Sequence, residues 1–297
     1  MLKNSRRTLL ALPVVAALTL SLAACGSDSD DSASAAGDSG ASGASGSDGD
    51  TASGDIETIR IGASPNPHAK ILEFVNDELA ADAGIELEIE TYDDYVLPNR
   101  ALFEGDLDAN FFQHLPYFEA QVEEHGFEFD HFPGIHIEPY ALYSTQHDAV
   151  ADIPDGAQIG VTNDPANQAR TLKLLAQDGL ITLDEAAGDE ASIFDVTDNP
   201  HDFDFVELAP EQLVHSLDDV DAAVINGNFA LEADLNPTVD GLLLEDGKDN
   251  PYANLVAFRS EDADSQALQT LDELLRSEET RTFIEENWDS GEIIPAF

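Results

Sequence analysis

Apolar and polar residues alternate over two short stretches near the start of the globular part of the chain, residues 56–61 and 85–92, and this alternation favours β-strands. Between them, apolar residues recur at the spacing of one helical face. Asn66-Pro67 in front is typical of a helix start. The order strand, helix, strand predicts a parallel crossover unit. The expected helical face consists of Ile71, Leu72, Val75 and Leu79.

A second alternating α/β unit begins near Tyr143. A further strand and two helices close the chain. Two α/β units joined by extended segments predict an α/β fold of two lobes, with a ligand cleft between them and hinge closure around the ligand. The second unit has expected strands at 157–162, 206–208 and 221–225 and helices at 164–177, 210–217 and 228–233. The closing elements are expected at 255–258, 263–275 and 277–287.

Residues 1–24 have the layout of a secretory signal peptide, with a basic start and an apolar stretch too short for a membrane span. The stretch ends in Leu22-Ala-Ala-Cys-Gly26, which resembles a bacterial lipobox. In such signals Cys25 becomes the lipid-bearing N-terminus of the mature protein. Cys25 is the single cysteine, so an intrachain disulfide is excluded. Arg6-Arg7 also resembles a twin-arginine signal, which leaves the export route open.

The segment that follows the signal, residues 25–55, is rich in Gly, Ser, Ala and Asp and cannot bury apolar area. It predicts a flexible acidic linker between the lipid and the globular body. The formal net charge of the whole chain is -49, which argues against binding nucleic acid. The charge favours adaptation to a saline environment, where salt screens repulsion between carboxylates. An ordinary acidic protein from outside the cytoplasm is the alternative.

The run Asn163-Asp-Pro-Ala-Asn-Gln-Ala-Arg170 follows an expected strand and opens an expected helix. Asn167 and Arg170 lie three residues apart, on one helical face near its start. A guanidinium there can hold a carboxylate through two parallel hydrogen bonds. These residues are therefore candidates for binding the carboxylate of an amino acid. The alternative is a surface arginine paired with an acidic neighbour.

Aromatic rings and amides are interleaved over residues 95–117, and Asn226 follows the apolar run 222–225. The rings could line an apolar slot that favours a thioether, or they could belong to the core. Asn226 lies at the carboxyl end of an expected strand, where α/β proteins bind ligands, although a turn asparagine is the alternative. The candidate slot residues are Tyr95, Phe112, His114 and Tyr117.

Catalytic and cofactor motifs are absent from the sequence. The serines lack a nucleophile-elbow context, and no glycine-rich phosphate loop is present. The eight histidines show no metal-ligand spacing, although His131 and His136 lie near acidic residues. We therefore expect no cofactor, no metal site and no enzymatic activity.

Seven sequence blocks follow one another along 56–297: Ile61–Ala69, Asp94–Leu102, Gly105–Tyr117, Glu138–Ser144, Asn163–Arg170, Ser216–Asn226 and Pro251–Leu255. Together they resemble the methionine-binding lipoproteins of ABC importers, the NlpA or MetQ type. The block that ends in Phe-Gln-His-Leu-Pro-Tyr117 is especially specific. The extreme acidity and His215 depart from the family pattern.

The resemblance implies a two-lobed periplasmic-binding-protein fold. Lobe I would hold 56–142 and 254–297, and lobe II would hold 143–253. Arg170 resembles the carboxylate-binding arginine of the family, and Asn167 and Asn226 its polar ligands for carboxylate and amine. The four slot residues resemble the walls around the ligand side chain.

The expected function is to capture methionine, L- and possibly D-, and deliver it to an ABC permease and its ATPase. The protein would be anchored by lipid to the extracytoplasmic face of the cell membrane. Another apolar amino acid or a methionine-containing dipeptide is an alternative ligand. A hydrolase using His114, or a purely structural lipoprotein, is the alternative from a different class.

Overall fold

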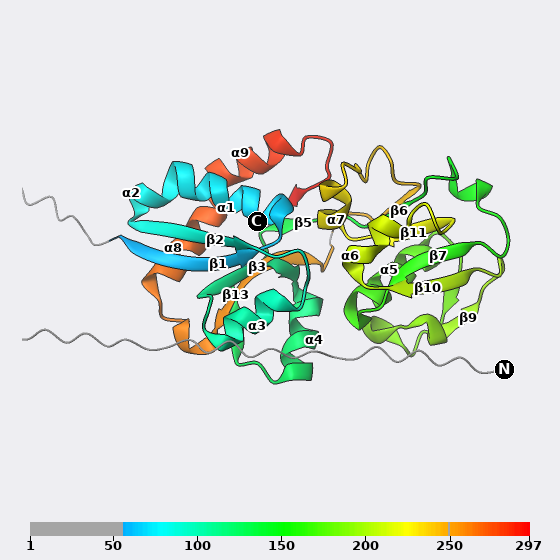
Figure 1. Ribbon diagram of the computed structural model, residues 1–297, viewed down its shortest axis with the longest axis horizontal. Coiled ribbons are helices and arrows are strands. Elements are labelled where there is room, and N and C mark those ends of the chain that lie inside the picture. The colour runs from blue at the N-terminus through cyan, green and yellow to red at the C-terminus, as the bar shows by residue number, and fades with distance from the viewer. Residues whose placement is uncertain (1–55, 249) are drawn as a thin grey trace, which may run out of the picture. The chain divides into compact units, whose positions relative to one another are not determined.

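The computed structural model describes residues 56–248 and 250–297. The predictions for the signal at 1–24, for lipidation of Cys25 and for the linker at 25–55 lie outside these residues. Two β-sheets organise the described part, each with helices against it (Figure 1). Among the helices of the described residues, none has the length and apolar content of a membrane span.

The first sheet has strand order β14-β5-β13-β3-β1-β2, and β4 pairs with β13. β1 lies parallel to β2 and β3, as the crossover pattern predicted, whereas β13 runs antiparallel to β3. The strands are β1 (Glu57–Ala63), β2 (Ile85–Thr91), β3 (Ala109–His114), β4 (Phe129–His131), β5 (His136–Ile137), β13 (Ala253–Arg259) and β14 (Ile294–Pro295).

Helices cover both faces of the first sheet, and β13 shows why. Its alternate residues Val256 and Phe258 belong to the apolar core with α1, α8 and α9, whereas Leu255 and Ala257 pack with α3 and α4. Successive side chains of a strand point to opposite faces, so one short strand supplies two cores. The helices are α1 (Lys70–Val75), α2 (Ala81–Ala83), α3 (Leu97–Glu104), α4 (Leu115–His125), α8 (Gln266–Leu275) and α9 (Glu278–Asn287).

The helix after β1 begins differently from the sequence prediction. Asn66 has extended backbone angles, φ -140° and ψ 130°, and its buried Oδ1 has no hydrogen-bond partner. These angles are those of a residue in front of a helix, with Pro67 at the first helical position, but the Asn66 side chain does not cap the helix end. The helical face itself is confirmed, because Ile71, Leu72 and Val75 are buried in the first core.

The second sheet has strand order β10-β7-β11-β6-β12, with β7 parallel to both of its neighbours and β6 antiparallel to β11. On β11, Ala222 and Val224 pack in the core that holds α5, and Ala223 and Ile225 pack with α6 and α7. The elements are β6 (Ala141–Tyr143), β7 (Gln158–Thr162), α5 (Pro165–Gln177), β10 (Asp204–Leu208), α6 (Pro210–Leu213), β11 (Ala222–Ile225), α7 (Gly227–Glu232) and β12 (Leu243–Leu244). A small hairpin-like sheet pairs β8 (Thr182–Leu183) with β9 (Val196–Asp198).

The chain passes from one sheet to the other after β5 and returns after β12. β5 pairs with β13 through Ile137 and Ala253, and β6 pairs with β12 through Ala141 and Leu244. The two passages therefore lie side by side where they leave the first sheet, at β5 and β13, and where they enter the second, at β6 and β12. The passages themselves, 138–140 and 245–252, supply residues to the site described next.

Candidate functional site

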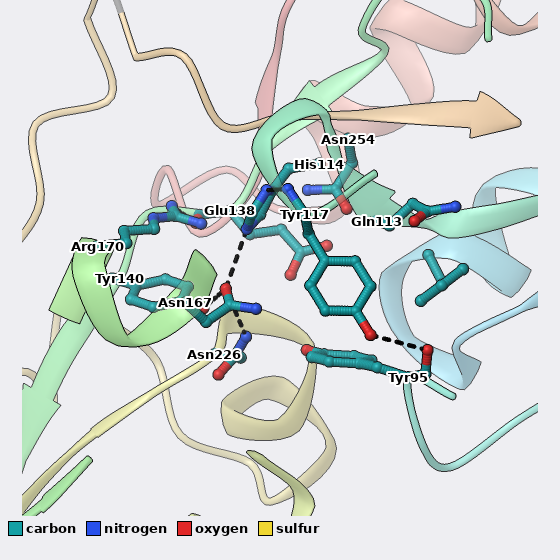
Figure 2. Close-up of a pocket in the computed structure, with 11 residues that line it drawn as sticks. Tyr95, Gln113, His114, Tyr117, Glu138, Tyr140, Asn167, Arg170, Asn226 and Asn254 are labelled. Carbon is teal, nitrogen blue, oxygen red and sulfur yellow. Dashed lines mark hydrogen bonds between the residues drawn. The ribbon is translucent and has the colours of Figure 1, made fainter. Parts of the chain in front are cut away.

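All seven ligand-binding residues expected from the sequence line one cavity of about 290 Å³. They come from both sheets. Phe112 and His114 end β3, while Asn167 and Arg170 occupy the first turns of α5. Asn226 follows β11, at the carboxyl end of a parallel strand, as the sequence predicted. Tyr95, from the loop before α3, and Tyr117, on α4, complete the group (Figure 2).

The start of α5 is built as the sequence predicted. The Asp164 side chain accepts the backbone N–H of Asn167 at 3.0 Å, and Pro165 occupies the first helical position. The same carboxylate oxygen accepts the side-chain amide of Asn167 at 3.1 Å. The cap therefore fixes the Asn167 side chain as well as the helix end. Because Asn167 donates through its Nδ2 atom, its Oδ1 atom is directed to the cavity side.

The Oδ1 atom of Asn167 joins the two sheets (Figure 2). It accepts from His114 Nε2 at 3.0 Å, from Asn226 Nδ2 at 3.3 Å and from the Tyr140 hydroxyl. His114 Nε2 must therefore carry the proton. His114 Nδ1 in turn accepts the backbone N–H of Tyr117 at 3.2 Å. Burial, together with the charge of Arg170, lowers the pKa of His114 to about 3, so this ring is neutral.

Arg170 is 2% exposed, yet its guanidinium is only partly available to a ligand. Nε donates to Glu245 at 2.9 Å, and Nη2 donates to Glu245 and to the main-chain oxygen of Glu138. No hydrogen bond of Nη1 is found within 56–248 and 250–297. The sequence alternative of pairing with an acidic neighbour is thus realised, but inside the cavity. Two parallel bonds from the Nε edge to a ligand are blocked by Glu245.

Two aromatic rings contact the Arg170 guanidinium. Its central carbon lies 3.7 Å from the Tyr140 ring centroid and 4.2 Å from that of Tyr252, distances typical of cation–π contacts. Burial lowers the pKa of Arg170, but the Glu245 carboxylate outweighs this effect, and the pKa lies above its ordinary value. The cation is thereby fixed in charge and in orientation.

Three rings form the apolar side of the cavity. The Tyr95 centroid lies 5.9 Å from that of Phe112 and 5.8 Å from that of Tyr117, and the latter two are 6.1 Å apart. The Tyr117 hydroxyl donates to the Tyr95 main-chain oxygen at 3.1 Å. The Tyr95 hydroxyl donates to Asn228 at 2.5 Å. Because both hydroxyls are engaged, the rings present carbon rather than polar atoms to the cavity.

Sequence reasoning missed four residues that line the same cavity. Glu138 and Tyr140 lie in the first passage between the sheets, where a carboxylate stands within a largely apolar run, 137–143. A charged residue in such a run is rarely buried without a function, so this signal was available. Gln113 and Asn254 carry no comparable signal, because single amides are common in strands and turns. The four residues are Gln113, Glu138, Tyr140 and Asn254.

The model of the NlpA lipoprotein family matches residues 59–297. The chain belongs to the NlpA lipoprotein family. It is 36% identical over 247 residues to the methionine-binding lipoprotein MetQ of Bacillus subtilis, covering 82% of this chain and 89% of the relative. It is also 36% identical over 227 residues to the D-methionine-binding lipoprotein MetQ of Escherichia coli, covering 76% of this chain and 83% of the relative.

Solved structures agree with this membership in the NlpA family. A nutrient-binding protein from Burkholderia cenocepacia bound to methionine is 38% identical, with a TM-score of 0.77 over 80% of this chain and all (100%) of that one. Lipoprotein Tp32 from Treponema pallidum is 36% identical, with a TM-score of 0.76 over 82% of this chain and 100% of that one. The expected two-lobed periplasmic-binding-protein fold is therefore confirmed.

Proposed function

We propose that this NlpA lipoprotein captures methionine and delivers it to an ABC importer. The observation that carries the proposal is one cavity in which a buried arginine and buried amides adjoin three aromatic rings. Such a cavity has a polar end for the charged backbone of an amino acid and an apolar end for its side chain. The methionine-bound relative from Burkholderia cenocepacia supports methionine as the ligand.

In this proposal each lining group has one role. Arg170 binds the ligand carboxylate through Nη1. Asn226 accepts from the ligand amine, because its buried Oδ1 has no partner within the described residues. Asn167 and His114 hold Asn226 and the helix start in place. The rings of Tyr95, Phe112 and Tyr117 enclose the thioether, and each sulfur–aromatic contact contributes about 0.3–1.5 kcal/mol.

Delivery requires the parts of the chain outside the described residues. Cys25 carries the lipid that anchors the protein to the extracytoplasmic face of the cell membrane, and 25–55 acts as the linker. The two lobes, expected at 56–142 with 254–297 and at 143–253, close on the ligand by bending at the crossings after β5 and after β12, which keeps β6 and β13 whole. The closed form is then the shape that the permease and its ATPase partner recognise.

The alternative ligands and activities differ in what the cavity would need. The cavity is small, which favours a single amino acid over a dipeptide. A hydrolase would need His114 as a base, yet both of its ring nitrogens are engaged, and its pKa of about 3 makes it a weak base. A purely structural role would leave the buried polar cavity without a purpose.

The test is direct identification of the ligand. The protein is purified without added amino acids, denatured and extracted, and the extract is analysed by mass spectrometry. We expect methionine in near-stoichiometric amount. Calorimetry on ligand-stripped protein with L-methionine, D-methionine, leucine and a methionine dipeptide then ranks the ligands. Absence of saturable binding to the whole panel would refute the proposal.

A further inference from the structure

Glu138 holds a buried carboxylate at the cavity wall. Its side chain is about 6% exposed, and two neutral groups donate to it, the His136 ring and the backbone N–H of Asn228, while the His68 ring lies beside it and bonds Asn254. Oε1 lies 2.9 Å from His136 Nε2 and 3.3 Å from His68 Nε2, and Oε2 accepts the backbone N–H of Asn228 at 2.9 Å. Two sheets thus contribute to one carboxylate, because the two histidines come from the first sheet region and Asn228 from α7.

No cation neutralises this carboxylate within 56–248 and 250–297. Burial lowers the pKa of His68 to about 4 and that of His136 to about 3, so both rings are neutral. Arg170 bonds only the main-chain oxygen of Glu138 and is paired with Glu245. Burial raises the pKa of Glu138, and His68, Arg170 and Asn228 offset this only in part. A buried carboxylate that has no cationic partner in the protein would be stabilised by a cation that the ligand brings.

Two kinds of cation fit such a cluster, a metal ion or an ammonium group. The ligand-type atoms of His68, His136 and Glu138 lie within 4.8 Å of one another. A metal on both Nε2 atoms would place protons on both Nδ1 atoms, and these buried atoms have no acceptor among the described residues. With the proton on Nε2 instead, His136 donates to Glu138 and His68 donates to Asn254, and each Nδ1 is an unprotonated nitrogen that needs no acceptor. His136 therefore acts as a donor to Glu138, and no metal is needed to account for the cluster.

We propose that Glu138 is a specificity-determining residue whose carboxylate faces the ammonium group of the ligand. The inference rests on the proposed function of amino-acid capture. In Figure 2 the Glu138 carboxylate lies among the lining side chains, between Arg170 with Tyr140 on one side and Tyr117 on the other. The unpaired Oδ1 of Asn226 lines the same cavity and supplies a neutral acceptor for the same group.

The site then recognises both charges of an amino acid. Arg170 takes the carboxylate, Glu138 takes the ammonium, and His136 is a positioning residue that holds the Glu138 carboxylate. Molecules that keep the thioether and the carboxylate but lack the positive charge are rejected. Hydrogen bonding through amides alone would not reject them, because a hydroxyl can replace an ammonium as a donor.

The first experiment uses the unmodified protein after ligand removal. Calorimetry compares methionine with 2-hydroxy-4-(methylthio)butanoate, in which a neutral hydroxyl replaces the ammonium. We expect the hydroxy compound to bind at least about 30-fold more weakly, the size of effect that follows when a buried charge loses its partner. A smaller ratio would overturn the proposal. Failure of methionine itself to bind would instead refute the proposed function.

The second experiment measures the same ratio in Glu138→Gln. We expect the preference for methionine over the hydroxy compound to fall at least about tenfold, chiefly through weaker methionine binding. Equal weakening of both ligands, with the ratio unchanged, would show a merely structural role. Asp272→Asn on α8 is the matched control, since Asp272 is 7% exposed and lines no part of the cavity. If Glu138→Gln does not fold, the ligand pair on the unmodified protein still decides.

Discussion

At the scale of single residues, Arg170, the proposed carboxylate-binding group, is also half of a buried ion pair. Glu245 occupies its Nε and Nη2 atoms, and two rings cover its faces. The guanidinium is therefore oriented before a ligand binds, and Nη1 is the nitrogen left for the ligand. The same arrangement makes its removal expensive, because Glu245, with its side chain 11% exposed, would be left without a partner.

Arg170→Met should therefore lower the free energy of unfolding by about 3–5 kcal/mol, the usual cost of breaking a buried pair by removing one partner. The double variant Arg170→Met/Glu245→Met should recover most of that loss, because no charge is left buried. Methionine binding should be lost in both. Urea unfolding and calorimetry on the two variants check this. Retained methionine binding in the double variant would contradict the assignment of Arg170.

The buried histidines make stability depend on pH. The unfolded chain protonates His136 near pH 6.5, whereas burial lowers the folded-state pKa to about 3. The unfolded state therefore binds more protons between these values, and stability falls as pH falls from about 6.5 towards 3. His136→Gln should remove this contribution, so its stability loss between pH 7 and 5 should be smaller by about 2 kcal/mol.

Urea titrations at both pH values give this difference. His201→Gln is the control, because the His201 ring is 41% exposed and pairs only with Asp155, whose side chain is 81% exposed. Carboxylate repulsion changes alike in all three proteins and cancels in the comparison. An unchanged pH dependence in His136→Gln would mean that the ring is not held neutral.

At the scale of elements, the start of α5 does two tasks. Asp164 caps the helix and also holds the Asn167 amide that gathers His114, Tyr140 and Asn226. α8 offers a comparison, because Ser265 caps it through Leu268 N–H away from the cavity. Loss of the α5 cap should therefore weaken ligand binding, whereas loss of the α8 cap should not.

Asp164→Ala and Ser265→Ala should each lower the free energy of unfolding by about 1 kcal/mol, the usual effect of losing a capping side chain. Only Asp164→Ala should also weaken methionine binding, by about tenfold, because it releases the Asn167 amide at a cost comparable to a charged hydrogen bond. Thermal melts and calorimetry on the pair separate the effects. Equal binding by the two variants would show that the cap does not position the site.

The sequence predicts elements well where their start signals are local. β7 and α5 were found because a strand pattern runs into Asp164-Pro165, and β11 because its apolar run ends at Asn226. The helix expected at 263–275 begins later, at Gln266, because Ser265 caps it. The three parallel strands of the second sheet were therefore predicted, whereas β6 and β12 at its antiparallel edge were not.

β3 shows why other elements stayed hidden. All six of its residues are buried, so no alternation marks it as a strand. It also carries buried amides, and Asn110 and Gln113 bond to each other and to Asn99 of α3. Pairing of this kind depends on residues from another element. The seven predicted site residues lie around one cavity, whereas Gln113 and Asn254 were missed because their places depend on contacts with residues of other elements.

At the scale of the whole molecule, the formal charge of -49 dominates the surface. Thirteen ion pairs are found among the described residues, four of them involving histidine, so most carboxylates face solvent without a cation. Salt shortens the range of their repulsion to a few ångströms near 1 M. The compact state is therefore expected to gain from salt.

The melting temperature should rise by about 5 °C or more between low salt and molar sodium chloride, equivalent to roughly 2 kcal/mol for a protein of this size. Differential scanning calorimetry measures the shift. Sodium and potassium chloride should act alike, because screening depends on ionic strength rather than on the ion. A flat response would remove the hypothesis of adaptation to a saline environment.

Arg170 touches both passages between the sheets. The first supplies the Glu138 oxygen and the Tyr140 ring, and the second supplies the Glu245 carboxylate and the Tyr252 ring. A ligand that binds this guanidinium would thus contact, through Arg170, both backbone segments that bend in the proposed closure of the lobes. Ligand binding and lobe movement therefore involve the same residues, and no longer chain of contacts is needed to connect them.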